Sequence, residues 1–139
     1  MNEIRKKIEE NFEKMQPVYF ATALDNQPSL RPVTLIRKDN DFFIATSNND
    51  AKIQQVKSNS KIEFCLPLKN KENIGYIRGL GIAEIISDSK VKEDIFNFVP
   101  CIKEFWKSAS DENYALLKLQ INLYDYLEPG KWIAEKIDI

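Results

Sequence analysis

The sequence contains no histidine. Histidine is the usual general base near neutral pH and the commonest protein ligand for zinc and for haem iron. Its absence excludes ordinary Ser-His-Asp and Cys-His hydrolases, and it excludes haem held by a proximal imidazole. If the protein carries out difficult chemistry, an organic cofactor is therefore the expected agent.

Cysteine is also scarce, because the chain has only Cys65 and Cys101. The two lie far apart in the sequence and neither belongs to a C-x-x-C arrangement. The sequence therefore indicates neither a disulfide framework nor a metal site. We expect no bound metal ion, and both cysteines should be buried free thiols.

Long apolar runs and an excess of one charge are missing as well. The N-terminus, MNEIRKKIEENFEKM, is charged throughout and lacks the apolar stretch of a secretion signal or a transmembrane helix. This favours a cytoplasmic location without membrane association. The 20 basic and 21 acidic side chains leave a net charge of -1, which speaks against nucleic acid as a partner.

A length of 139 residues with 43% hydrophobic content fits one domain, residues 1–139, with a substantial core.

The first residues have apolar side chains at helical spacing, which predicts an amphipathic N-terminal helix that ends at Pro17. The apolar stripe of this helix consists of Ile4, Ile8, Phe12 and Met15.

Six later segments have the composition or the alternation of β-strands. They cover residues 18–24, 29–39, 41–47, 61–68, 74–86 and 115–127. A short helix follows the third strand, where Asn48 or Asn49 can cap it, and one or two helices precede the last strand. Pro32 cannot donate a ladder hydrogen bond and should lie at an edge or an irregularity of the sheet. The fifth strand has three glycines on one face, which suggests bends or the close approach of another backbone or a flat ligand. They are Gly75, Gly79 and Gly81.

This pattern predicts a mainly β fold with helices, of the β-barrel or α+β class. Short strands at close spacing are typical of a closed or partly closed antiparallel barrel, with the helices across its mouth or side. Alternation of apolar and polar residues argues against a doubly wound parallel sheet.

The segment 31–52 brings together groups that bind phosphate. Thr46 and Ser47 offer hydroxyl and backbone N–H groups just before the short helix, whose N-terminus favours an anion. Lys52 lies in the first turn of that helix, and Arg31 could add a planar guanidinium from the neighbouring strand. Each residue alone is more often ordinary surface, but their order and spacing together favour a phosphate site.

This order, a strand with RPV, a turn, a strand ending in ATS and a helix with lysine in its first turn, resembles the pyridoxamine 5'-phosphate oxidase-like family of FMN-binding split barrels. The resemblance covers most of the chain, is strongest over residues 18–68 and continues through YIRGLGIAEIISD. It implies a six-stranded antiparallel Greek-key split barrel. It also implies a homodimer that holds FMN at the subunit interface.

The resemblance further implies roles for individual residues. Those expected at the FMN phosphate are Arg31, Thr46, Ser47 and Lys52. Pro32, Val33 and Thr34 would present their backbone to the flavin ring, and Tyr76 would reach the cofactor of the other subunit. No catalytic side chain is assigned.

Two departures separate the chain from the pyridoxamine 5'-phosphate oxidases themselves. Ile36 and Ala51 stand where those oxidases carry further basic residues. The chain also ends EPGKWIAEKIDI, without their Arg-Leu-Ala-Pro type motif, which grips substrate. The resemblance is therefore to the smaller, general-stress-protein-like members of the family rather than to the oxidase itself.

We expect an FMN-dependent oxidoreductase, in which flavin moves electrons from a reduced nicotinamide to a small-molecule acceptor. The alternative is a flavin-binding protein without turnover, serving as an electron carrier, reservoir or stress sensor, and the alternative cofactor is a deazaflavin. A barrel for single-stranded nucleic acid would need a basic groove with stacking aromatics, which the balanced charge opposes. Trp106 and Trp132 could stack on a flavin or pack in the core or at a subunit interface.

Overall fold

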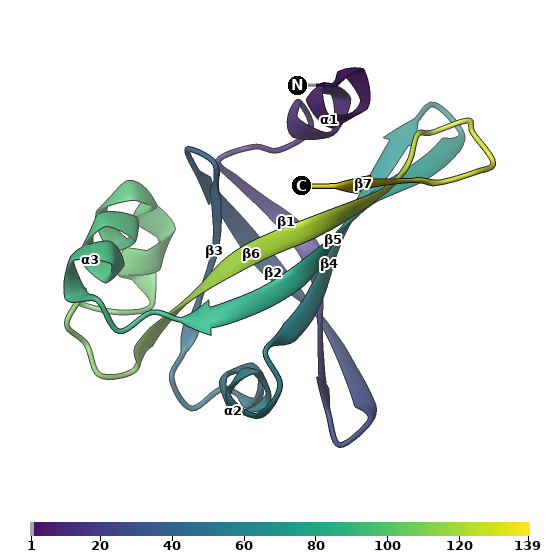
Figure 1. Ribbon diagram of the computed structural model, residues 1–139. Coiled ribbons are helices and arrows are strands. Elements are labelled where there is room, and N and C mark those ends of the chain that lie inside the picture. The colour runs from purple at the N-terminus through teal and green to yellow at the C-terminus, as the bar shows by residue number, and fades with distance from the viewer. Residues whose placement is uncertain (1) are drawn as a thin grey trace.

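Seven antiparallel strands form one sheet in the computed structural model, which describes residues 2–139 (Figure 1). The strands are β1 (Met15–Leu24), β2 (Gln27–Lys38), β3 (Asp41–Ser47), β4 (Lys61–Asn70), β5 (Asn73–Ile85), β6 (Tyr114–Leu127) and β7 (Glu135–Asp138). Their order is β3-β2-β1-β4-β5-β6-β7, and a further pairing of β3 with β6 closes the first six into a barrel. The helices are α1 (Glu3–Glu9), α2 (Ala51–Ser58), α3 (Ser89–Phe98) and the 3-10 helix η1 (Pro100–Glu104). Within residues 2–139, no helix is long and apolar enough to cross a membrane.

The predicted class, a mainly β barrel with helices, is confirmed, but the sheet has seven strands rather than six. The additional strand is β7, which pairs with residues 123–126 of β6. Its sequence, EKID, is short and mostly charged, so no alternation of apolar and polar residues marks it as a strand. It forms because the long β6 extends beyond the barrel and offers a row of backbone partners.

The N-terminal helix is shorter than the sequence predicted. α1 ends at Glu9, so the last two apolar residues of the predicted stripe lie outside it, and Pro17 belongs to β1. Pro17 is tolerated in the strand because β1 pairs there with β2 alone, while β4 joins only at residues 19–21. Phe12 is buried nevertheless, and its ring meets Phe42 edge-on with 4.9 Å between the ring centroids. The stripe thus predicted the core contacts but not the end of the helix.

β2 and β3 separate over most of their length, and this split opens the barrel. β2 pairs with β1 over residues 27–36 but with β3 only over residues 36–38. Pro32 lies on the edge left open by the split, as predicted, where its missing N–H costs no ladder hydrogen bond. Along residues 27–35 this open edge of β2 has no strand partner within residues 2–139.

Two apolar clusters stabilise the fold. The first fills the barrel, and its most deeply buried aromatic side chains are Phe20 and Phe64. The second lies on the other face of β3 and β6, where α3 and η1 cover it (Figure 1). Ile102 of η1 belongs to this second cluster. Packing of the second cluster therefore fixes η1 beside the split between β2 and β3.

Candidate functional site

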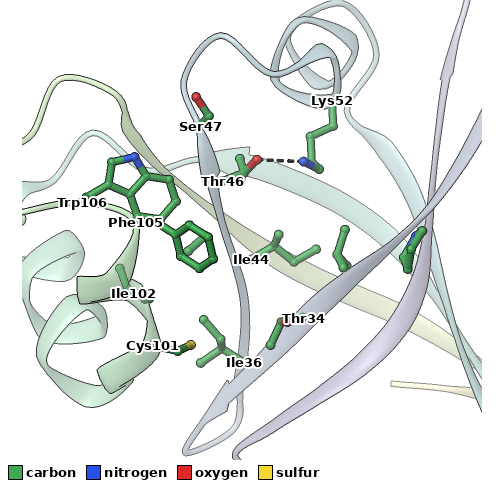
Figure 2. Close-up of a pocket in the computed structure, with 13 residues that line it drawn as sticks. Thr34, Ile36, Ile44, Thr46, Ser47, Lys52, Cys101, Ile102, Phe105 and Trp106 are labelled. Atoms are coloured by element: carbon green, nitrogen blue, oxygen red, sulfur yellow. Dashed lines mark hydrogen bonds between the residues drawn. The ribbon is translucent and has the colours of Figure 1, made fainter.

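A cavity of about 360 Å³ lies at the split between β2 and β3 (Figure 2). Its walls are the open edge of β2, the strand β3, and η1 with the residues that follow it. Six of the eight predicted site residues line it, namely Pro32, Val33, Thr34, Thr46, Ser47 and Lys52. Arg31 and Tyr76 lie outside the lining. The cavity has a polar end, formed by Thr46, Ser47 and Lys52, and an apolar end next to η1.

Lys52 carries the charge at the polar end. Its side chain leaves the first turn of α2 toward the end of β3, where Nζ donates to Thr46 Oγ1 at 2.7 Å (Figure 2). Nζ also forms an ion pair with Asp50 Oδ1 at 3.0 Å. Only 7% of Lys52 is exposed. Because a buried ammonium group requires partners for its charge, these two contacts hold it in one position at the cavity wall.

Asp50 contacts Lys52 of the polar end without lining the cavity, a contact that the sequence did not reveal. It is the N-cap of α2, and its Oδ1 accepts from the Lys52 N–H at 3.0 Å. Partial burial raises the pKa of this carboxyl, but hydrogen bonds from Lys52 and the charges of Lys52 and Arg31 outweigh it, so the pKa is lowered. The carboxylate is therefore ionised at neutral pH. The sequence predicted Asn48 or Asn49 as the cap, and both precede the true cap, Asp50. Residue type does not distinguish the three, because asparagine and aspartate cap helices about equally well.

Ser47 faces the cavity, but its hydroxyl group is engaged elsewhere. Its Oγ lies 2.7 Å from Asn49 Oδ1 and 2.8 Å from Asn113 Oδ1. These contacts join the loop after β3 to the loop before β6. Thr46, in contrast, accepts from Lys52 and keeps its own hydroxyl hydrogen to donate. Thr46 is therefore the better placed of the two hydroxyl groups for an anion in the cavity.

Arg31 lies beside the polar end without lining the cavity. Its guanidinium donates to Gln55 Oε1 at 2.8 Å, to Thr22 Oγ1 at 3.0 Å and to the carbonyl of Phe20 at 3.1 Å. Burial lowers the pKa of Arg31, and the nearby Asp50 carboxylate acts in the opposite direction. One carboxylate thus faces both cations of the site. The role of Arg31 at a phosphate stays a prediction.

The apolar end is formed by Ile36 of β2 together with Cys101, Phe105 and Trp106. Phe105 is 73% exposed. Trp106 packs against Tyr114 with 5.3 Å between the ring centroids, so it contributes to the second apolar cluster and lines the cavity at the same time. This end offers contact surface for a flat apolar group.

Both cysteines are free thiols, as predicted, but each is half-buried rather than buried. Cys101 lines the cavity. Cys65 lies on β4, where burial raises the pKa of its thiol. Within residues 2–139, no group of three or more metal-ligating side chains lies close enough together to hold a metal ion.

Tyr76 lies on β5 and points away from the barrel interior. The next residue, Ile77, is fully buried, whereas Tyr76 is half-buried and Ile74, on the same side of the strand, is 72% exposed. In the sheet Tyr76 lies between Pro67 of β4 and Leu127 of β6. The side chain is therefore on the outer face of the sheet, and its contact with the cofactor of another subunit stays a prediction.

Trp132 does not line the cavity. It is 96% exposed in the segment between β6 and β7, where it lies beside a separate shallow hollow lined by Ile74 and Leu127. The structure therefore brings Trp106 to the candidate site but not Trp132.

Comparison with known proteins gives both a family and a fold. The sequence profile described as pyridoxamine 5'-phosphate oxidase matches residues 4–127. The structure of general stress protein 26 from Bacillus anthracis str. Sterne is similar with a TM-score of 0.79 at 21% identity, covering 99% of this chain and 100% of that one. No curated protein matches the sequence.

Two further solved structures are similar. A putative pyridoxamine 5'-phosphate oxidase from Listeria innocua has a TM-score of 0.75 at 17% identity, covering 90% of this chain and 98% of that one. A heme binding protein from Mycobacterium smegmatis has a TM-score of 0.73 at 9% identity, covering 90% of this chain and 53% of that one. At these identities the structural likenesses show the fold.

Proposed function

The chain belongs to the pyridoxamine 5'-phosphate oxidase family, among its general-stress-protein-like members rather than as the oxidase itself, and from this premise we propose that it is an FMN-binding oxidoreductase. One observation carries the proposal. At the polar end of the cavity, the buried Lys52 in the first turn of α2 donates to Thr46 at the end of β3, beside the open edge of β2.

The residues of the cavity fit the phosphate of FMN. A phosphate at the polar end would meet Lys52 Nζ, the hydroxyl group of Thr46 and the N-terminus of α2. These supply a full charge, a hydrogen bond and a favourable dipole. Arg31, whose guanidinium donates to Gln55 of α2, would add to the positive potential.

The open edge of β2 fits the ring system. Pro32, Val33 and Thr34 line the cavity and have no strand partner on that side within residues 2–139. Their backbone groups are therefore available to a flat ring that has polar atoms along its edge. Phe105 and Trp106 offer apolar contact at the other end. FMN combines such a ring with a phosphate, and the cavity combines the matching surfaces.

The departures from the oxidases favour a different substrate. Ala51 is exposed in the first turn of α2, and Ile36 belongs to the apolar end, so neither adds a charge for a phosphate. The Arg-Leu-Ala-Pro type motif is absent from the C-terminal segment. We infer a looser hold on FMN phosphate than in those oxidases, and a substrate other than pyridoxamine 5'-phosphate.

Bound flavin would supply hydride and electron transfer between a reduced nicotinamide and a small acceptor. The protein would anchor the phosphate, orient the ring and shield it from water. Such roles need no histidine, so the composition of the chain is no obstacle.

The test is spectroscopic. Purified protein should bind FMN with a flavin absorbance spectrum, release FMN on denaturation, and oxidise a reduced nicotinamide in the presence of an acceptor. Protein that gains no bound spectrum on addition of FMN would overturn the proposal. A flavin spectrum without nicotinamide oxidation would favour an electron carrier, reservoir or stress sensor, and tighter binding of a deazaflavin would change the cofactor.

We also propose that two copies complete the site. Pro32, Tyr19, Cys65 and Arg78 occupy neighbouring register positions across β2, β1, β4 and β5. This outer face includes two strongly exposed apolar side chains, Tyr19 at 47% and Leu30 at 69%. Exposed apolar surface of this kind is typical of subunit interfaces. Since the open edge of β2 borders it, a homodimer through this face would cover the flavin and bring Tyr76 of the partner subunit close to it.

A further inference from the structure

Asp50 competes for the cation that a bound phosphate would use. Lys52 Nζ lies 3.0 Å from Asp50 Oδ1, and the backbone N–H of Lys52 donates to the same oxygen at 3.0 Å. The carboxylate therefore already occupies two donors at the start of α2, and both are donors suited to an anion.

The two side chains differ in depth. The side chain of Lys52 is 9% exposed, whereas that of Asp50 is 40% exposed. The lysine is thus the deeper of the two, and the carboxylate lies nearer to solvent. An anion that reaches Lys52 from the cavity comes close to Asp50.

The charges of the polar end partly cancel. Arg31 and Lys52 carry two positive charges and Asp50 carries one negative charge, which leaves a single positive charge to face a phosphate. The lowered pKa of Asp50 keeps its charge in place at neutral pH.

We propose that Asp50 sets the flavin specificity of this cavity by weakening the binding of a phosphate-bearing flavin relative to one without phosphate. The inference rests on the proposed FMN site and deepens it. A phosphate held by Lys52 would lie close to the Asp50 carboxylate, where repulsion in a partly solvated site lowers affinity by roughly five- to thirtyfold. Asp50 thereby makes the cofactor exchangeable rather than permanently held.

The carboxylate has a second role as a helix cap, and the test must separate the two. Asparagine caps helices about as well as aspartate, so Asp50→Asn removes the charge and keeps the cap. Asp50→Ser, a second capping residue, gives an independent variant in case the first does not fold. The matched control is Asp88→Asn, because Asp88 caps α3 through the N–H groups of Lys90 and Val91 and lies outside the cavity lining.

The experiment titrates FMN and riboflavin into wild type and the variants by flavin fluorescence quenching. We expect Asp50→Asn to tighten FMN binding by about five- to thirtyfold and to change riboflavin binding less than twofold. Asp88→Asn should change neither.

Three outcomes overturn it. Equal FMN affinity in wild type and both Asp50 variants would show that the carboxylate does not act on the phosphate. Weaker FMN binding in the variants would show that Asp50 serves to hold Lys52 in place. Equal gains for FMN and riboflavin would mean an effect on the ring or the fold. Absence of FMN binding in every variant would overturn the proposed function itself, which distinguishes the two failures.

Discussion

The charge of Lys52 should decide the affinity of the cavity for phosphate. Lys52→Met keeps the apolar stem but removes the hydrogen bond to Thr46 and the charge, and it leaves Arg31 as the remaining cation near Asp50. We expect FMN binding to weaken by about 1.5 to 3 kcal/mol, on the order of ten- to a hundredfold. Riboflavin lacks the phosphate, so its affinity should change little. Fluorescence titration of both flavins measures the contrast.

Lys57 provides the control for this variant. It lies in the last turn of α2 and is exposed, so Lys57→Met removes the same charge from the same helix without touching the cavity. It should bind both flavins as wild type does. Equal losses of FMN and riboflavin in Lys52→Met would mean that Lys52 supports the fold or the ring, and no loss would make it an ordinary helix lysine.

Tyr114 should make the fold sensitive to alkali. Its side chain is 1% exposed, and burial raises its pKa to about 12, against about 10 for an exposed tyrosine. Below pH 10 the phenol is neutral in both folded and unfolded chains. Between pH 10 and 12 only the unfolded chain ionises, so the free energy of unfolding should fall by up to about 2.5 kcal/mol.

Urea unfolding of wild type and Tyr114→Phe at pH 8, 10 and 11 tests this expectation. The variant loses the hydrogen bond from the phenol to the carbonyl of Lys92, so it should be less stable at pH 8 but lose less stability as the pH rises. Some slope should persist, because burial also raises the pKa of Tyr124. The exposed Tyr19, changed to Phe, is the control. Parallel pH profiles for wild type and Tyr114→Phe would contradict the argument.

Residue types predicted six of the residues that line the cavity, but not the pairing of its charges. The strand end and the first-turn lysine predicted Thr46 and Lys52, because hydroxyl groups and a helix N-terminus are local features of the chain. The position of Arg31 against Thr22 and Gln55 depends on how α2 packs on β1 and β2, which no local spacing encodes. Tertiary packing, rather than residue type, keeps Arg31 out of the cavity lining.

At the scale of elements, the bulge between β5 and β6 depends on glycine. The register shifts between Leu80 and Gly81, and a Cβ atom added at Gly81 would overlap the carbonyl oxygen of Gln120. Because that oxygen belongs to the backbone of β6, it cannot rotate away. We expect Gly81→Ala to lower the free energy of unfolding by about 2 kcal/mol or more. Chemical denaturation measures it.

Glu84→Ala on the same strand is the control, since Glu84 is exposed. It should change stability by less than about 0.5 kcal/mol. A Gly81→Ala variant as stable as wild type would mean that the two strands can move apart without cost.

The strands were predictable from alternation, whereas their partners and the helix ends were not. The three glycines of β5 were expected to allow close approach, and Gly75 and Gly81 do lie against the backbone of β6, while Gly79 faces the ring of Phe64. Nothing in the sequence distinguishes these two kinds of neighbour. Likewise, β1 includes Pro17 because pairing with β2 outweighs the helical spacing of the apolar residues before it.

At the scale of the whole molecule, the outer face combines apolar surface with a central group of charges. Arg78 pairs with Glu63 at 2.6 Å and with Asp125 at 2.8 Å, and the hydrogen bonding that it donates to Glu63 is the main reason its pKa is raised. Both carboxylates pair with this one guanidinium, so Arg78 itself is fully paired while the group keeps a net charge of -1. A second copy could therefore cover it without burying a lone arginine.

Leu30 offers the sharpest test of that second copy. It lies on β2 two residues before Pro32 and on the same face, 69% exposed, so Leu30→Glu would place a charge in the proposed interface without disturbing the core. We expect light scattering to show a dimer for wild type and a monomer for Leu30→Glu, with weaker FMN binding in the monomer. Ile133→Glu, at an apolar position 80% exposed in the segment before β7, should stay dimeric. A monomeric wild type that binds FMN would mean that one chain holds the complete site, and the open edge of β2 would then face solvent rather than a partner.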